Sequence, residues 1–350
     1  MVLALGASLP IQAQNSYKQV LREKDKAFFQ TEEARRIGDQ LLVYQRVTGG
    51  WPKNIDMVKP MTGAEVAKVK GEKSRQDDST TDNDATNMQM FYLARLYQAT
   101  GTAKYKEAFC KGVEYLLSGQ YDNGGWPQFW PKMRDYQPHI TFNDDAMVNT
   151  LNVLRDVYLQ KAPFEGDITT EDLRKKAKTA FDKGVECILN CQIKKDGQLT
   201  VWCQQHDHVT LAPAKARAYE LPSYSSAESA DIVKLLMKVK NPSQRIKQAV
   251  KGAMQWFDAN KLTGVRVEHT GKKGTPECNT FLVKDSTASP LWARYYDLEE
   301  CKPFVCDRDG ILRRDLSEIG PERRNGYAWY NDKPAQLYSL YQKWKEKYDK

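Results

Sequence analysis

The chain has 350 residues, of which 41% are hydrophobic and 28% charged, and its formal net charge is +8 at pH 7. This composition excludes wholesale disorder, and no run approaches the roughly 20 apolar residues that a membrane-spanning helix needs. The positive charge favours an anionic partner, but the basic residues are scattered among acidic ones. We therefore expect neither a membrane span nor a nucleic-acid partner.

The first fourteen residues differ from the rest. A short apolar run over residues 2–10 is followed by small residues around Ala13. This is typical of the second half of a secretory signal peptide, although the basic segment that normally precedes the run is missing. An apolar N-terminus without a targeting role is the alternative. We expect a partial signal peptide over residues 1–14, one domain over residues 15–350, and a secreted or periplasmic protein.

Three segments of the chain repeat one pattern. Leu41–Lys53 matches Leu116–Gln128 without a gap, and a degraded third copy begins at Ile188 and reaches Trp202. The repeated glutamines are Gln45, Gln120 and Gln192. A period of this length is long enough for two helices joined by long loops.

The segments on either side of these loops have helical periodicity. Apolar residues recur at three- and four-residue steps over residues 105–117 and 173–189, before two of the glutamines. Further helices are expected over residues 86–99, 146–158, 229–238, 243–257 and 335–346. Short strands are expected near residues 199–202 and 263–268. Because three helix pairs can bury their apolar faces by closing into a ring, we predict an all-α fold, an (α/α)3 toroid, with an irregular helical bundle as the alternative.

Doubled acids precede two of the predicted helices. The first cluster contains Asp82, Asn83 and Asp84, and the second contains Asp144 and Asp145. One acid per helix start is explained by capping, but a second one exceeds what capping needs. Calcium binds six to eight oxygen ligands from carboxylates, amides, water and bound ligands. The surplus predicts a Ca²⁺ site that includes Asp82, Asn83 and Asp144, with plain helix caps as the alternative.

A loop over residues 202–223 is rich in basic, aromatic and polar side chains. Lys215 and Arg217 in this loop would attract a carboxylate or phosphate, and arginine offers a planar bidentate fork. A solvated basic loop is the alternative. The triplet of His206, Asp207 and His208 is a weak metal signal, because the remaining histidines do not complete a zinc pattern in the sequence.

The chain has seven cysteines, an odd number. At least one thiol therefore stays free, and a dense disulfide framework is excluded. Cys301 and Cys306 are close enough in sequence to bridge, and Cys187 and Cys191 lie one helical turn apart.

In their order along the chain, these motifs resemble the pectate lyases of polysaccharide lyase family 10. The motifs are Gly49–Asn54, Thr81–Thr86, Asn123–Gln128, Phe142–Met147, the stretch Cys203–Ser226 and Arg324–Tyr327. The resemblance covers roughly residues 30–345. It implies a secreted α/α toroid that cleaves polygalacturonate by calcium-assisted β-elimination. We expect residues 15–350 to form the catalytic domain and the protein to be a monomer.

The resemblance also implies roles for individual residues. Asp82, Asn83 and Asp144 would lie at the calcium and substrate-carboxylate site, and Arg217 would be the base that removes the proton at C5 of the uronate. A substrate-binding arginine is expected downstream. We place it at Arg308, while Arg294 and Arg324 remain alternatives. From the loop of Arg217, Lys215, Tyr219 and His206 are also expected to contact substrate.

An arginine base has a chemical difficulty. The pKa of free arginine lies above ~12, so a base role requires neighbouring cationic charge and is helped by alkaline pH. Lys215 would be the easier base on chemistry alone. Two other readings stay open: a noncatalytic pectin-binding toroid, and a glycoside hydrolase on the same fold with Asp84 and Asp145 as acid and base.

Overall fold

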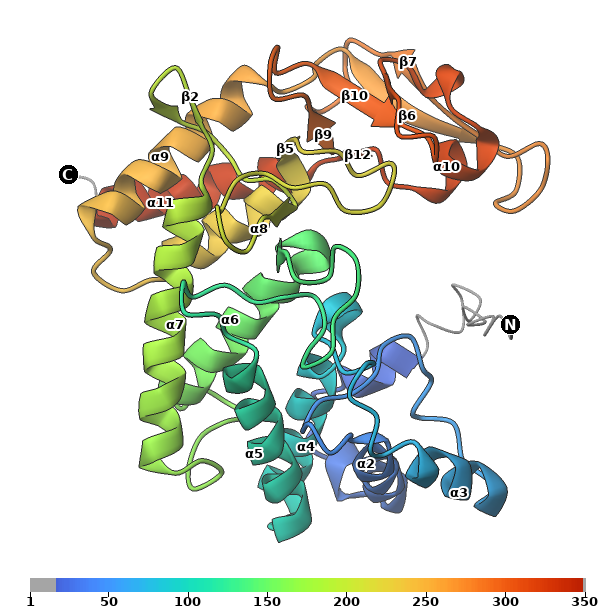
Figure 1. Cartoon of the computed structure of the whole chain (residues 1–350), viewed down its shortest axis with the longest axis vertical. Helices are drawn as coiled ribbons and strands as arrows, with labels where there is room; N and C mark the ends of the chain where they lie inside the picture. Colours follow the sequence, from blue (N-terminus) through green and yellow to red (C-terminus); the bar gives the residue numbers. More distant parts are fainter. Residues whose placement is uncertain (1–16, 349–350) are drawn as a thin grey trace. The chain divides into compact units, whose positions relative to one another are not determined.

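The computed structural model describes residues 17–348 (Figure 1). The expected signal peptide lies outside the described residues. The chain divides into two compact units: one consists of the residues up to Pro138 with Asp144–Gly184, and the other of His139–Asn143 with the residues from Val185 onward. The expectation of one domain over residues 15–350 stays a prediction. Between residues 17 and 348, no helix has both the length and the apolar character required to cross a membrane.

The first unit is helical. Its elements are η1 (Phe28–Gln30), α2 (Glu32–Tyr44), α3 (Gly63–Gly71), η2 (Asp82–Asp84), α4 (Asn87–Thr100), α5 (Ala103–Ser118), α6 (Ala146–Tyr158) and most of α7 (Glu171–Cys191). The helices predicted over 86–99, 105–117, 146–158 and 173–189 are confirmed. The apolar face of α5 is fully buried, and α4 ends before Gly101, whose φ of 66° closes the helix.

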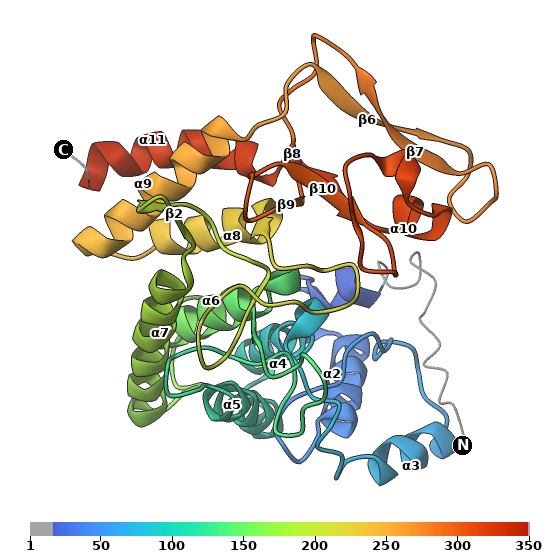
Figure 2. The ribbon, with the colours of Figure 1, turned by 45° about the horizontal axis from the view of Figure 1, so that its top comes forward.

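The second unit combines helices with short strands. Its helices are α8 (Ser226–Met237), α9 (Gln244–Ala259), α10 (Pro321–Gly326) and α11 (Leu337–Tyr348), together with η4 (Leu316–Glu318) and η5 (Lys333–Gln336). The three long helices α8, α9 and α11 lie side by side (Figures 1 and 2). They confirm the last three predicted helices, to within a few residues at each end.

All the strand pairs are antiparallel. The paired strands are β1 (Ile140–Thr141) with β4 (Gln205–His206), β2 (Lys194–Lys195) with β3 (Gln198–Leu199), β6 (Val265–Thr270) with β7 (Asn279–Lys284), and β12 (Tyr330–Asn331) with β8 (Trp292–Ala293). A four-stranded sheet has the order β11 (Leu312–Arg313), β10 (Pro303–Cys306), β9 (Tyr295–Tyr296), β5 (Tyr224–Ser225). Both predicted strand regions therefore contain strands, and the unit has more β-structure than the sequence indicated.

The three repeated glutamines make equivalent hydrogen bonds. The Nε2 of each donates to a carbonyl in its own loop and to the carbonyl of an alanine in the first helix of the following repeat. The alanine contacts are Gln45 to Ala108 at 2.9 Å, Gln120 to Ala180 at 2.8 Å and Gln192 to Ala249 at 2.9 Å. The glutamines thus tie each repeat to the next, which explains their spacing in the sequence.

The repeated tryptophans are equally regular. Each is fully buried, and its Nε1 donates to a carbonyl near the end of the preceding helix. The contacts are Trp51 to Leu41, Trp126 to Leu116 and Trp202 to Ile188, at 2.7–2.8 Å. Trp292, which follows α9 in the chain, makes the same contact: its Nε1 donates to the carbonyl of Phe257, near the end of α9. The structure therefore contains a fourth copy of this contact, whereas the sequence showed only three repeated segments.

All seven cysteines are free thiols. The sulfurs of Cys187 and Cys191 are 4.0 Å apart on neighbouring turns of α7, about twice the length of a disulfide bond. Cys301 and Cys306 are not bridged either.

Candidate functional site

The two acid clusters have the same unusual backbone. Asn83 and Asp84 have φ values of 54° and 64°, and the aligned residues Asp144 and Asp145 have values of 49° and 59°. The left-handed region is costly for most residues and is tolerated best by Asn and Asp. Two consecutive left-handed residues at matching places in both repeats point to a constraint beyond chain reversal.

These acids make no side-chain capping hydrogen bond to α4 or α6. The residues at the N-cap positions of α4 and α6 are Thr86 and Asp145, and neither makes a side-chain capping hydrogen bond. The capping alternative therefore does not account for the doubled acids.

Asp82 has one satisfied and one unsatisfied oxygen. Its side chain is 2% exposed, and its Oδ2 accepts a hydrogen bond of 3.0 Å from Gln128 Nε2 and pairs with Lys53 Nζ. Lys53 and Gln128 are the aligned residues that follow Trp-Pro in the first two loops. Oδ1 is buried without a hydrogen-bond partner among the described residues. Since an unsatisfied buried carboxylate oxygen is costly, this atom fits the requirement for a cation ligand.

The turn that carries Asp82 packs against the start of α6. Asp84 Oδ1 accepts a hydrogen bond of 3.2 Å from Asn149 Nδ2, and Asp84 Oδ2 pairs with Arg22 at 2.6 Å. The carbonyl of Asn83 accepts a hydrogen bond from Lys18. The helix starts that carry the two acid clusters therefore meet within the first unit. Asp144, in the turn that leads into α6, is exposed.

In the second unit, Arg217 is held by a buried carboxylate. Its Nε donates to Glu220 Oε2 at 2.7 Å, and its Nη2 pairs with Oε1. The side chain of Glu220 is 1% exposed and that of Arg217 is 42% exposed, so Arg217 forms the accessible side of the pair. Burial alone lowers the pKa of the guanidinium, but the hydrogen bonds and charge of Glu220 outweigh burial and raise this pKa overall.

Three guanidinium groups surround the ring of Tyr219. Those of Arg323, Arg217 and Arg308 lie 4.5, 4.9 and 5.9 Å from its centroid. Tyr219 is only 4% exposed, so the ring is a platform that gathers the arginines. Glu322 pairs with Arg308 and Arg323, and Glu220 pairs with Arg217, so one positive charge in excess remains to suit an anionic ligand. The sequence did not single out Arg323, which comes just before the quoted Arg324 motif.

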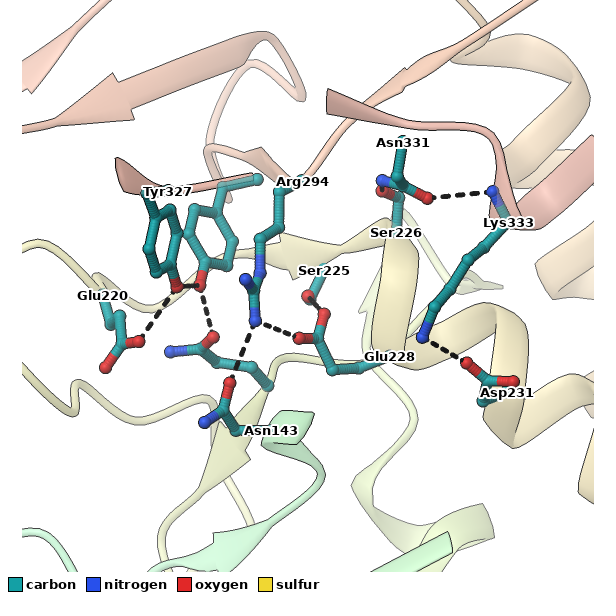
Figure 3. Close-up of polar contacts among 12 residues, drawn as sticks. Asn143, Glu220, Ser225, Ser226, Glu228, Asp231, Arg294, Tyr327, Asn331 and Lys333 are labelled. Atoms are coloured by element: carbon teal, nitrogen blue, oxygen red, sulfur yellow. Dashed lines mark hydrogen bonds and ion pairs between the residues drawn. The ribbon is translucent and has the colours of Figure 1, made fainter. Parts of the chain in front are cut away.

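A line of polar contacts continues from Glu220 into the interior (Figure 3). Tyr327 Oη donates to Glu220 Oε1 at 3.0 Å and lies 2.6 Å from Tyr295 Oη, which donates to Gln204. Burial raises the pKa of Tyr327. Burial also raises the pKa of Tyr295, so both tyrosines stay protonated and each can donate its one hydroxyl proton. Glu220 and Tyr327 lie within the quoted motifs, but nothing in the linear pattern marked them as partners.

The candidate downstream arginines differ in environment. Arg294 is 12% exposed, and its Nη2 donates to Glu228 at 2.6 Å and to Asn143 at 3.0 Å (Figure 3). Arg308 is 65% exposed and pairs with Glu322, and Arg324 is half-buried. Of these three candidates, Arg308 is the one whose guanidinium lies over the same Tyr219 ring as that of Arg217.

His206 is located in the interior. It has no exposed surface; its Nδ1 lies 2.8 Å from the Leu211 carbonyl, and its Nε2 accepts a hydrogen bond from the amide of Cys203. Burial lowers the pKa of His206 to about 4. With both nitrogens engaged, its ring has no atom to offer a ligand, and we assign it to the fold rather than to substrate. Lys215, by contrast, is exposed.

Comparison with known proteins identifies the family. Residues 45–338 match the family described as pectic acid lyase. A search of curated proteins finds no match. Among solved structures, a family 10 polysaccharide lyase from Cellvibrio cellulosa is similar, with 33% identity over 97% of this chain and 98% of that chain and a TM-score of 0.80. A mutant of a family 10 polysaccharide lyase from the same organism, in complex with trigalacturonic acid, matches over 95% and 96% with the same identity and TM-score.

These matches confirm the resemblance found in the sequence. They also confirm the predicted fold class, because the chain is rich in helices and family 10 lyases are (α/α)3 toroids. The chain belongs to the pectic acid lyase family and is a polysaccharide lyase with the family 10 fold.

Proposed function

We propose that this enzyme cleaves polygalacturonate by β-elimination, with the help of Ca²⁺ and with Arg217 as the Brønsted base. The trigalacturonic acid bound to the similar lyase supports the substrate. The observation that carries the proposal is the buried, unsatisfied Oδ1 of Asp82 beside a second acid cluster in the aligned conformation.

Asp82, Asn83 and Asp144 would hold the cation. Lys53 and Gln128 fix Oδ2 of Asp82 and thereby leave Oδ1 as the atom available for a ligand. When bound, Ca²⁺ supplies positive charge that attracts the uronate carboxylate and stabilises the negative charge developing during proton removal.

Arg217 would act on the hydrogen at C5. The C5 proton passes to the neutral guanidine, the electron pair of the C–H bond forms the C4–C5 double bond, and the C4–O bond breaks. The departing oxygen then takes a proton. Because Glu220 raises the pKa of Arg217, the neutral form requires alkaline pH. Arg323 opposes Glu220, since its positive charge repels that of Arg217 and so disfavours a protonated guanidinium there.

The test is to incubate the protein with polygalacturonate at alkaline pH, with Ca²⁺ or with a chelator. Unsaturated products raise the ultraviolet absorbance, and we expect this rise with Ca²⁺ only. New reducing ends without the rise would identify a hydrolase, and substrate binding without either signal would identify a noncatalytic binding protein. Both outcomes contradict the proposal.

The proposal extends to the setting of the enzyme. A polysaccharide is too large to diffuse across a membrane, so we place the enzyme outside the cytoplasm, secreted or periplasmic, and acting as a monomer. Fractionation of producing cells and size-exclusion chromatography with light scattering test these two points.

A further inference from the structure

His139, Asp207 and His208 converge in the second unit. One ligand atom from each lies within 4.8 Å of the other two, and no other group of three or more such side chains is found between residues 17 and 348. The three residues of the sequence motif therefore differ in their surroundings. His206 is buried, whereas Asp207 and His208 lie close to His139 from a distant segment. His139 precedes β1 and lies far from Asp207 in the sequence, so no short zinc-binding motif contains both residues.

The strand register explains the convergence. In the antiparallel pair β1–β4, Ile140 lies opposite His206. Continuing this register by one residue brings His139 opposite Asp207, and directly opposed residues project to the same side of an antiparallel pair. His139 Nδ1 lies 3.9 Å from Asp207 Oδ2. The pairing of β1 with β4 therefore explains why the side chains of His139 and Asp207 lie close together.

The carboxylate of Asp207 is already oriented. Its Oδ1 accepts hydrogen bonds from the amides of Val209 and Thr210 at 3.0 and 2.7 Å, and from Thr210 Oγ1 at 3.0 Å. This arrangement leaves Oδ2 on the side of His139. The Nδ1 of His139 is buried and makes no hydrogen bond within the described part of the chain. Metal ligands are commonly held by such outer hydrogen bonds.

The ligand chemistry selects the type of ion. Two imidazole nitrogens and one carboxylate oxygen suit zinc and related divalent transition metals, whereas calcium takes oxygen ligands. Tetrahedral zinc places its ligand atoms ~3.4 Å apart. Side-chain rotations that move the ligand atoms of His139, Asp207 and His208 by about an ångström would bring them to this spacing around an ion. The side chains of His139 and Asp207 are 23% and 33% exposed, which leaves a path for the ion and for a water as fourth ligand.

We propose that His139, Asp207 and His208 form a zinc-class metal site, separate from the calcium site proposed at Asp82. The ion would join the start of β1 to the loop after β4, the loop that continues to Arg217. Since such an ion binds the folded state only, it would stabilise this loop.

The test uses the full-length, untagged protein after removal of metals with a chelator. Zn²⁺ is titrated by calorimetry, and Co²⁺ by its visible absorption. We expect one ion per chain, a Co²⁺ spectrum typical of four or five ligands, and a higher thermal unfolding midpoint with Zn²⁺. His139→Gln and His208→Gln should each weaken Zn²⁺ binding by about tenfold or more.

Two controls make the result specific. His269→Gln alters a histidine in β6 whose Nδ1 lies 3.0 Å from Thr280 Oγ1, and it should leave Zn²⁺ binding unchanged. Asp82→Asn should also leave it unchanged. Circular dichroism without metal checks that each variant folds. Absence of stoichiometric binding, equal binding by His208→Gln and the wild type, or loss of binding in Asp82→Asn would each overturn the proposal.

Discussion

Glu220 engages Arg217 through both of its carboxylate oxygens, and one of these contacts is a hydrogen bond of 2.7 Å from Arg217 Nε. The pair orients the guanidinium but also favours its protonated form, which cannot act as a base. The same carboxylate accepts a hydrogen bond from Tyr327, so its position is fixed from the interior. The enzyme therefore combines good positioning of Arg217 with a need for alkaline pH.

The first prediction concerns the pH dependence of catalysis. Glu220→Gln removes the negative charge that raises the pKa of Arg217, so the neutral guanidine should form at lower pH. The rise of kcat/KM with pH should shift towards neutral pH, while the maximal rate falls because one orienting contact weakens. The measurement is the pH profile of product absorbance. An unshifted profile would show that Arg217 is not the titrating base.

The second prediction concerns acid stability. Burial raises the pKa of Glu220, but the hydrogen bonds and charge of Arg217 outweigh burial and leave the pKa below its ordinary value of 4.5. The stabilisation is therefore present above about pH 4.5 and is lost as the pH falls towards the folded-state pKa. Urea unfolding at several pH values should show the wild type losing more stability on acidification than Glu220→Gln. Equal losses would contradict this account.

The third prediction separates the base from substrate binding. Arg217→Ala should lower kcat by about 10²–10⁴-fold and leave the Kd for oligogalacturonate nearly unchanged. Arg308→Ala should instead raise KM by about tenfold, through the loss of a charged hydrogen bond. Arg245→Ala, which alters an exposed arginine of α9, is the matched control and should behave as wild type. A large loss of substrate affinity in Arg217→Ala would assign this residue to binding.

The fourth prediction concerns calcium. Asp82→Asn retains the shape of the side chain but removes its charge, so the Ca²⁺ concentration for half-maximal activity should rise roughly tenfold or more. Asp77→Asn changes an acid paired with Arg75 and Arg134 and should leave the calcium dependence unchanged. Activity is followed over a Ca²⁺ titration. An unaltered midpoint in Asp82→Asn would exclude this residue as a ligand.

The fifth prediction concerns the repeat contacts. Gln45→Ala leaves the carbonyls of Gly49 and Ala108 without their donor in a buried place, and should lower the free energy of unfolding by about 1–3 kcal/mol. Gln76→Ala, at an exposed glutamine, should change it little. Urea denaturation provides the comparison. Equal stability of the two variants would show that the tie contributes nothing.

The sequence predicted the helices where periodicity was strong. The segment of α6 has a continuous apolar pattern, and its bounds were predicted correctly. In contrast, α3 was missed, because it lies on the surface and buries only Val69. Two-residue strands such as β5 and β9 have no period that a sequence can display, so the four-stranded sheet was not foreseen.

Prediction of the candidate site had similar limits. The doubled acids were recognisable because they exceed what capping needs, and a shared Ca²⁺ site required the two turns to lie close together. Glu220 was overlooked, since a glutamate three residues after an arginine is ordinary in any loop. His139 could not be linked to Asp207 without the register of β1 on β4, which pairs segments more than sixty positions apart.

The ties between repeats also bear on how the chain is made. Each glutamine finds its alanine 63, 60 or 57 residues later in the chain. A nascent polypeptide leaving the ribosome can therefore close one tie after another, each requiring only the first helix of the following repeat to emerge. Synthesis and folding can then proceed in the same direction, without waiting for the C-terminus.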